Sequence, residues 1–575
     1  MLQIWNSYLR RIVPLGLLWL LPLTFLFIFY FYPLSSILKL SFERQSSGIL
    51  TPFLEALNSP SIRQVFWFTI WQAALSTLLC LAIGLPGAYL FARFNFRGKS
   101  ILQALTVIPF VLPTVVVAAA FYALLGPTGF VNNALVQIFS LEAPPIQFTN
   151  TIYAILLAHI FYNTTIILRM VGDFWSHIDP RLDQAARTLG ATPITAFFKV
   201  TLPILGQAIT AAALLVFIFN FTSFGVILIL GGPKFANLEV EIYNQTISFF
   251  NLPLAAVLSI LQLTSTLVMT VIYTHLNRSM SQPIQLRARS FTQKRITTWR
   301  QRLFAGILIL FLFSLLISPL LALSIKSFTN PGLGRGERTS RSVGFTLDNY
   351  RQLSINRRES FFFVPPLIAV RNSLVYASIA VILTLAIGMP ASWALTRYSD
   401  SFFNRLLDPV LMLPLGTSAV TMGLGFIVAL NLPPLNLRAS PILIPLAHTL
   451  VAFPFVVRSL TPSLRSINPR LRQAAGILGA SPFQVFHAVD LPLVGRAIII
   501  AGTFAFTISL GEFGATALIA RPEYPTIPLM IYRFISQPGA TNYGQAMALS
   551  TILMAVAAAG IIIIERLRIA QIGEF

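Results

Sequence analysis

The sequence predicts an all-α membrane protein with about twelve transmembrane helices, arranged as two parallel halves of six helices each. The first reason is composition: of 575 residues, 56% are hydrophobic and only 10% are charged. The second is that apolar stretches of roughly 20 residues or more recur, each long enough to cross a hydrocarbon core about 30 Å thick. In lipid such stretches form helices, because every backbone polar group needs a partner within the segment. The third is an internal repeat, in which polar motifs of the first half return in the second.

The first apolar stretch has no A-x-A-like cleavage site, so it is expected to remain as a membrane anchor. The single cysteine, Cys80, lies inside the second stretch, which excludes a disulfide framework and CxxC metal sites. In chain order, hydropathy places the predicted spans at 15–38, 64–92, 101–125, 150–170, 205–231, 253–276, 303–325, 368–395, 405–430, 440–457, 494–518 and 543–564.

The net charge of +22 is distributed as in a membrane protein rather than a nucleic-acid-binding one. Basic residues gather in alternate short loops, which the positive-inside rule assigns to the cytoplasm, together with both termini. The segment 326–366 fits poorly, because it is basic but falls on the outer side. The inner basic residues are Arg10, Arg11, Arg93, Arg97, Lys99, Arg278, Arg287, Arg289, Lys294, Arg295, Arg300 and Arg302. We therefore expect a multi-pass protein of the bacterial plasma (inner) membrane, in contact with lipid and not with nucleic acid.

The internal repeat has a constant spacing of 289 residues over a long gapless stretch, and one of 304 residues further upstream, where Gly84 answers to Gly388. It predicts a first half at 1–276, a basic cytoplasmic linker at 277–302 and a second half at 303–575. An even number of spans per half brings equivalent loops to the same side of the membrane. Pairs 289 residues apart include Gln184-Ala185-Ala186 with Gln473-Ala474-Ala475, Gly190 with Gly479, Leu202-Pro203 with Leu491-Pro492, Phe224-Gly225 with Phe513-Gly514, and His159 with His448.

Two polar segments, 182–209 and 471–498, carry most of these matches and face the cytoplasm in the predicted topology. Each begins with an Ala-rich stretch that favours helix. Gly190 and Gly479 then allow the chain to turn. Thr192-Pro193 and Ser481-Pro482 combine a helix cap with a first-turn proline. A helix–turn–helix is predicted in each, ended by Leu-Pro before the next span. A plain amphipathic linker is the less demanding alternative.

The pattern of these segments resembles the EAA loop of permease subunits in bacterial ABC importers: E-A-A, three residues, G, nine residues, an apolar residue, one residue, then L-P. Both copies fit, with Val200 and Val489 in the apolar position, and with Gln184 and Gln473 replacing the usual Glu. Glutamine keeps the hydrogen bonds but cannot form the ion pair. The fused twelve-span arrangement is similar to the ferric-iron and thiamine importer group. The stretches 413–426 and 509–532 also resemble second halves in that group.

This resemblance implies a type I ABC importer permease architecture and a non-catalytic permease subunit. Two copies of a separate ATPase subunit would bind ATP and dock on the two loops, and a periplasmic or lipid-anchored binding protein would deliver the substrate. The coupling residues it implies are Gln184, Ala185, Ala186, Gly190 and Pro203 in the first half, and Gln473, Ala474, Ala475, Gly479 and Pro492 in the second. Ferric iron is the first candidate substrate and thiamine the second. No catalytic residue and no cofactor is expected within this chain.

An ion-coupled transporter or channel is the alternative, and it would need ionisable residues deep in the spans. Three residues qualify as possible pathway or gate residues. His159 and His448 occupy matching positions near mid-span, where interhelical hydrogen bonding is the plainer interpretation, and no metal site is assigned. Glu512 either lines the path or caps a helix.

Overall fold

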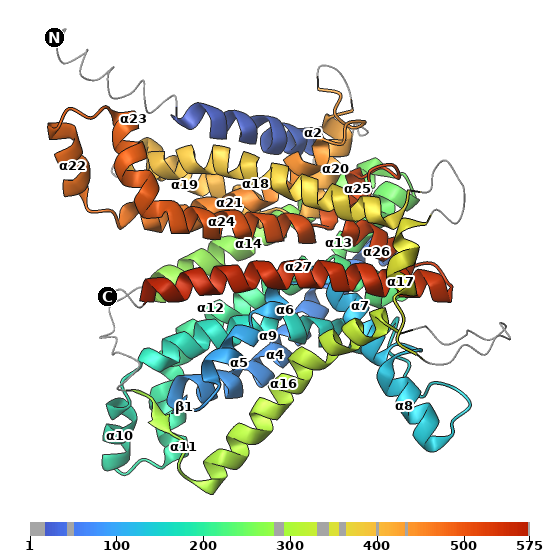
Figure 1. Cartoon of the computed structure of the whole chain (residues 1–575), viewed down its shortest axis with the longest axis horizontal. Coiled ribbons are helices and arrows are strands. Elements are labelled where there is room, and N and C mark those ends of the chain that lie inside the picture. Colours follow the sequence, from blue (N-terminus) through green and yellow to red (C-terminus); the bar gives the residue numbers. More distant parts are fainter. Residues whose placement is uncertain are drawn as a thin grey trace.

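A computed structural model describes residues 18–42, 51–280, 292–329, 344–355, 364–397, 402–431 and 435–572. Several basic residues used to predict topology, including Arg10, Arg11, Arg287 and Arg289, lie outside these ranges. Within them, eleven helices are long and apolar enough to cross a membrane. A bent pair, Phe402–Gly416 and Ala419–Ala429, makes a twelfth span if it is counted as one. The predicted all-α membrane fold is confirmed, and Figure 1 shows its long helices running roughly side by side.

The first repeat begins with one apolar helix, Leu18–Phe42, which includes the π turn η1 and α2. The remaining elements are α3 (Thr51–Asn58), α4 (Pro60–Arg93), β1 (Phe94–Asn95), α5 (Lys99–Leu105), α6 (Ile108–Val111), α7 (Thr114–Leu125), α8 (Phe130–Phe139), α9 (Ile152–His177), α10 (Arg181–Thr188), α11 (Pro193–Ala196), η2 (Phe197–Thr201), α12 (Leu202–Phe221), η3 (Ile227–Gly231), η4 (Gly232–Lys234), α13 (Leu238–Tyr243), η5 (Asn244–Ser248) and α14 (Leu252–Met280).

The second repeat has a similar order of long and short helices, but its described residues include no counterpart of α8. Its elements are β2 (Lys294–Arg295), α16 (Trp299–Ser327), α17 (Asp348–Arg351), η6 (Gln352–Ser354), α18 (Pro366–Arg397), α19 (Phe402–Met412), η7 (Leu413–Gly416), α20 (Ala419–Ala429), α21 (Leu443–Arg465), α22 (Pro469–Ile477), α23 (Pro482–Val485), η8 (Phe486–Asp490), α24 (Leu491–Gly511), α25 (Gly514–Ile519), α26 (Ile527–Ile535) and α27 (Ala540–Ile572).

The spans 101–125 and 405–430 were each predicted as one continuous helix, and this prediction is wrong, because both are broken near their middle. In the first repeat the chain turns at Leu112, whose backbone is extended, because a residue before proline disfavours the helical conformation. In the second repeat the two pieces meet at 96°, and Ser418 caps the start of α20. Helix α7, which begins at Thr114, and helix α20, which begins at Ala419, are therefore equivalent.

The predicted spans 205–231 and 494–518 are also too long, because their helices end at Phe221 and Gly511. An irregular backbone is tolerated at this depth only where protein satisfies its polar groups. Side chains do this in the first repeat: Gln72 Nε2 donates to the Asn220 carbonyl at 3.0 Å, and Asn237 Nδ2 to the Ser223 carbonyl at 2.6 Å. These hydrogen bonds allow the helix to end at Phe221 and the chain to continue as short, irregular segments.

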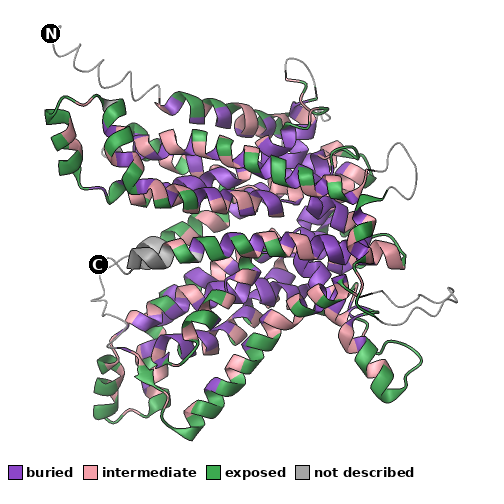
Figure 2. Ribbon diagram, in the orientation of Figure 1, coloured by how far each residue is buried: buried purple, intermediate pink, exposed green. Residues whose placement is uncertain are grey.

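The first helix of each repeat packs on the other repeat. Helix α2 lies against α20, and Tyr30 in the preceding π turn hydrogen-bonds to Thr417 at 2.8 Å. Helix α16 lies against α7 of the first repeat and against α27. The two halves defined by the sequence repeat are therefore interlocked in space, and their inner helices share a buried core (Figure 2).

Candidate functional site

The two polar segments form projecting helix–turn–helix loops at the same end of the molecule. Helices α10 and α11 lie at the lower left of Figure 1, and α22 and α23 at the upper left. None of the residues of α10 or α22 is buried. Figure 2 shows both helices as largely exposed. The parallel arrangement of the two repeats, expected from an even number of spans, accounts for this shared side.

The turn in each loop has the predicted glycine geometry. Gly190 has φ +91° and Gly479 has φ +83°, a left-handed conformation that side-chain-bearing residues rarely adopt. The hydrogen bonds around them match: Ala191 N donates to the Ala186 carbonyl and Ala480 N to the Ala475 carbonyl, both at 3.1 Å. These bonds satisfy carbonyls at the helix end.

The caps that follow the glycines are also as predicted. Thr192 Oγ1 accepts from Thr195 N at 3.2 Å, and Ser481 Oγ accepts from Gln484 N at 3.3 Å. Gln484 Oε1 in turn accepts from Ser481 N at 2.7 Å, which completes a reciprocal cap. The second helix of each loop therefore starts at a defined residue.

The expected break at Leu-Pro is wrong. In each repeat a single π turn, η2 or η8, runs directly into the long helix, and Pro203 and Pro492 lie in its first turn. Leu202 N donates to the Phe197 carbonyl across the wider turn. A proline has no N–H to donate and crowds the preceding turn of a regular helix, and the wider π turn before Pro203 and Pro492 accommodates it. The loop is consequently continuous with the membrane helix behind it.

The two loops differ in how they are held. In the second, Arg472 Nε donates to Asp490 Oδ1 at 2.6 Å, and Trp393 Nε1 donates to Asp490 Oδ2 at 3.1 Å. Asp490 is fully buried, so this carboxylate ties the loop to α18. The positions 289 residues earlier are Asp183 and Thr201, which cannot form the same pair.

Of the residues that the resemblance assigns to coupling, Gln184, Ala185, Gly190 and Pro203 in the first loop are exposed, as are Gln473, Ala474, Gly479 and Pro492 in the second, whereas Ala186 and Ala475 are half-buried. Next to them, equivalent apolar side chains are also exposed: Leu189 is 89% and Leu478 87% accessible. Exposed apolar groups rimmed by polar ones mark contact surfaces.

A cavity of about 470 Å³ lies between the two repeats. The first repeat contributes residues from the end of α12 and from α7 and α9, and the second contributes residues from η7, α20, α21, α24 and α25. Thr114, the first residue of α7, and Ser418, the cap of α20, both line it. The wall includes seven aromatic side chains: Phe110, Tyr162, Phe219, Phe224, Phe455, Phe504 and Phe513.

Four aromatic rings form a chain at the junction of the repeats. Phe224 and Phe513 stack with centroids 5.3 Å apart and planes at 27°. Phe224 also contacts Tyr243, and Phe513 contacts Tyr532, each at 5.5 Å. Both pairs of equivalent residues are separated by 289 positions. A side chain at Gly225 would overlap Thr114, so the close packing beside the stack requires glycine.

The two histidines singled out by the sequence lie in separate networks. His159 is buried and contacts Ser76 Oγ through Nδ1 at 3.0 Å and Ser223 Oγ through Nε2 at 2.9 Å. His448 contacts Ser509 Oγ through Nδ1 at 2.7 Å and Thr516 Oγ1 through Nε2 at 2.9 Å. His159 also lines the cavity. Among the described residues no group of three or more His, Cys, Asp or Glu is placed to hold a metal ion.

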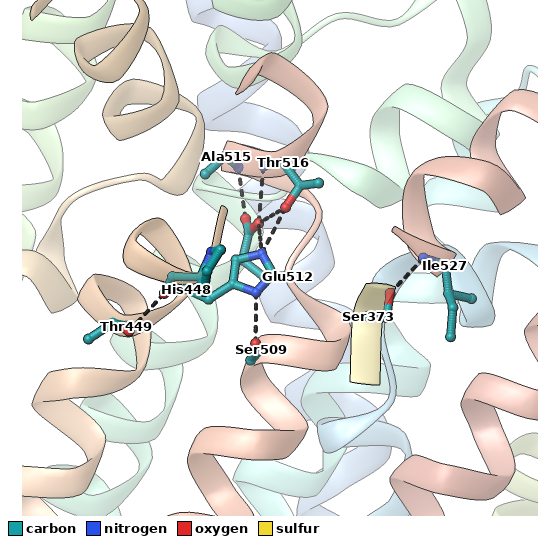
Figure 3. A network of polar contacts seen from close by, with 9 residues as sticks. Ser373, His448, Thr449, Ser509, Glu512, Ala515, Thr516 and Ile527 are labelled. Carbon is teal, nitrogen blue, oxygen red and sulfur yellow. Dashed lines mark hydrogen bonds and ion pairs between the residues drawn. The ribbon is translucent and has the colours of Figure 1, made fainter. Parts of the chain in front are cut away.

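Glu512 is buried beside His448 (Figure 3). Its Oε1 accepts from Ala515 N at 2.7 Å and its Oε2 from Thr516 N at 3.1 Å, so it caps α25. His448 Nε2 lies 3.3 Å from Oε2. Its carboxylate is not among the groups that line the cavity. This geometry is that of a helix cap, the second of the two interpretations that the sequence allowed.

Sequence reasoning missed Glu239, a buried carboxylate in the cavity wall. Its position in the second repeat is taken by Pro528, so the repeat gave no signal. The available signal was an acidic residue in a short segment enclosed by apolar stretches.

A multi-pass membrane protein built from two related, parallel halves, with a shared cavity and two projecting loops at one end, is organised as a transport permease. Residues 83–282 match the family of binding-protein-dependent transport system inner membrane components. Over these residues the chain is similar to ABC transporter permease domains of the inner membrane, which are non-catalytic transporter components.

The chain is also similar to several transport proteins, over different shares of its length. A probable ABC transporter permease protein of Sinorhizobium fredii is 26% identical over 93% of this chain and 92% of its own length. The thiamine transport system permease proteins of Brucella abortus and Escherichia coli are each 26% identical, over 87% and 83% of this chain and 86% and 84% of their own. A solved bacterial ABC transporter that imports alginate is 19% identical, with a TM-score of 0.41, over 49% of this chain and all of its own.

Proposed function

We propose that the chain forms the translocation path of a binding-protein-dependent importer, and that two ATPase subunits drive it by docking one on each projecting loop. The observation that carries this proposal is the equivalence of the loops. They share their turn geometry, lie at one end of the molecule and expose apolar side chains at matching positions, including Leu189 with Leu478. A dimer of identical ATPase subunits needs two equivalent contact surfaces.

In this proposal both loops, and both termini, face the cytoplasm, where ATP is available. Closure of the ATPase dimer would bring the loops together. Because each loop runs through a π turn directly into α12 or α24, their movement would be passed to the helices that line the cavity. The halves would then rock as rigid bodies and open the cavity to alternate sides. The family match favours this importer over an ion-coupled transporter.

For the cargo we propose thiamine. Two of the relatives reported above are described as thiamine permeases, and none of them as an iron permease. The aromatic wall of the cavity also suits a flat organic molecule better than a hydrated metal ion. Ferric iron, which the resemblance put first, becomes the second candidate.

The test is transport by the complete complex. The permease, its ATPase and its binding protein are reconstituted in proteoliposomes, and uptake of labelled thiamine is measured with ATP on the loop side. ATP-dependent uptake is expected, with Fe³⁺ unable to compete. ATP-dependent Fe³⁺ uptake without thiamine uptake would contradict thiamine as the cargo. Failure of the ATPase to bind either loop would contradict the proposal that the loops couple the ATPase to transport.

A further inference from the structure

We infer that Glu239 and the aromatic rings of the cavity form a binding site for an organic cation on the transport path. This inference deepens the proposed function, because it gives the class of molecule that the cavity accepts and the residue that selects it. Thiamine, whose thiazolium ring carries a permanent positive charge, belongs to that class.

Glu239 is held rigidly against the cavity. It is the second residue of α13, and Asn237 caps that helix by accepting from Val240 N at 3.0 Å. The same Asn237 side chain donates to the Ser223 carbonyl, which anchors α13 to the irregular segment after α12. Only 1% of the Glu239 side chain is exposed, so its carboxylate is oriented by protein rather than by solvent.

The carboxylate joins both repeats but has no cationic partner in the described part of the chain. Gln262 Nε2 donates to Oε1 at 2.9 Å, and Ser418 Oγ donates to Oε2 from the start of α20. No Lys, Arg or His nitrogen within the described ranges forms an ion pair with it, in contrast to Glu512 and Asp490. A carboxylate offers about four acceptor positions, so two donors leave capacity for a ligand.

The charges of the wall point to a cation as that ligand. Glu239 is the one acidic residue among the described groups that line the cavity, and the wall contains no lysine or arginine. A buried carboxylate without a counter-charge is costly, so the site favours either a proton or a bound cation. An anionic cargo would be repelled at short range in this apolar surrounding.

The aromatic rings define what kind of cation fits. Phe219 and Phe455 are each 38% exposed, and Phe224 and Phe513 stack at one end of the same cavity. Aromatic faces attract weakly hydrated, delocalised cations, and quaternary ammonium groups in particular. A carboxylate in the same cavity wall as such rings would add recognition of charge to the π contact.

The test compares a cation with its neutral isostere. The purified permease in nanodiscs is dialysed against radiolabelled benzyltrimethylammonium or neopentylbenzene, which differ in charge and not in shape. Wild-type protein should bind the cation at least about tenfold more tightly. Equal binding of the two probes, or no binding of the cation, would overturn the inference without any variant being needed.

Two substitutions assign the effect to this residue. Glu239→Gln keeps the size and most hydrogen bonds but removes the charge, and should abolish the preference for the cation. Glu241→Gln is the matched control: it lies on the same helix, its carboxylate accepts from Gln245, and it does not line this cavity. An unchanged preference in Glu239→Gln would overturn the inference, as would an equal loss in Glu241→Gln.

Thiamine uptake separates this inference from the proposed cargo. If the wild-type complex imports thiamine and Glu239→Gln imports it equally well, the cargo stands and the role of Glu239 fails. If the complex does not import thiamine but still binds benzyltrimethylammonium through Glu239, thiamine is not the cargo, and the cation site at Glu239 is supported.

Discussion

Phe224 and Phe513 occupy the same place in the two repeats and stack on each other with ring centroids 5.3 Å apart. Each residue follows shortly after the end of a long helix: Phe224 after α12, which ends at Phe221, and Phe513 after α24, which ends at Gly511. The contact therefore lies on the pseudo-symmetry axis that relates the halves, and Tyr243 and Tyr532 extend it on either side. A movement that separates the halves at this point must break the stack, and we expect the stack to close the proposed path.

The first prediction concerns that closure. Phe513→Ala removes one ring of the stack, a contact worth about 0.5–1.5 kcal/mol beyond the area it buries. Passive efflux of a small trapped solute from proteoliposomes without ATP should rise several-fold. Phe219→Ala is the control, because Phe219 lines the same cavity but pairs with Phe110 instead. Equal leakage through both variants would show that the stack is not the barrier.

The second prediction concerns the glycine turns. Valine at Gly479 or Gly190 must adopt a left-handed backbone, which costs a non-glycine residue about 1–2 kcal/mol. Apart from the chain neighbours, no atom of the described residues lies within 4 Å of an added Cβ at either position, so the effect is conformational rather than steric. Transport and ATPase binding should fall together while membrane insertion persists.

The matched control for this prediction is Gly476→Val, three residues earlier in α22. It also has open space around its Cβ, but it does not have a positive φ. This variant should transport normally. Normal uptake in the double variant Gly190→Val/Gly479→Val would contradict the role of the turns.

The third prediction concerns the ion pair that holds the second loop. Asp490→Ala leaves Arg472 without its partner and Trp393 without its acceptor. Breaking a buried pair is strongly destabilising, and with Arg472 19% exposed the expected loss is about 2–4 kcal/mol. The thermal midpoint should fall and protease cleavage in the second loop should rise. Arg470→Ala, an exposed neighbour, should change neither.

The fourth prediction concerns Glu512. Its carboxylate accepts two backbone N–H groups at the start of α25, so Glu512→Ala should lower stability by about 0.5–2 kcal/mol, the usual effect of losing a cap. Glu512→Gln keeps an acceptor, so it should lower the thermal midpoint of unfolding less than Glu512→Ala does. If Glu512→Gln unfolds normally but transports poorly, the residue acts on the path and not as a cap.

The fifth prediction is topological. Single cysteines at Thr192 and Ser481, in a Cys80→Ala background, should resist impermeant thiol reagents in intact cells and react in inverted vesicles. Both positions lie in exposed or half-exposed caps of the projecting loops. Bound ATPase should protect both. Labelling of one loop from outside would mean that the halves are inverted and that the importer assignment is wrong.

Much of this protein was determined by sequence alone. Long apolar stretches must become helices in lipid, so the fold class followed from composition. A spacing of 289 residues between Gly190 and Gly479 was enough to predict two loops with the same turn, because a left-handed residue and a cap are local features. The boundaries of individual spans followed less well, since hydropathy does not register a break at Leu112 or after Phe221. At these breaks Tyr162, Gln72 and Asn237 donate to the carbonyls of Leu112, Asn220 and Ser223.

The tertiary structure alone decided how the halves combine. The packing of α2 on α20 and of α16 on α7 joins segments hundreds of residues apart, and such contacts leave no periodic signal along the chain. The cavity forms because helix ends of both repeats lie together. Glu239 is linked to the second repeat by its hydrogen bond with Ser418, which lies 179 residues away in the sequence. Local chemistry follows from neighbours in the sequence, whereas a site shared by two repeats depends on neighbours in space.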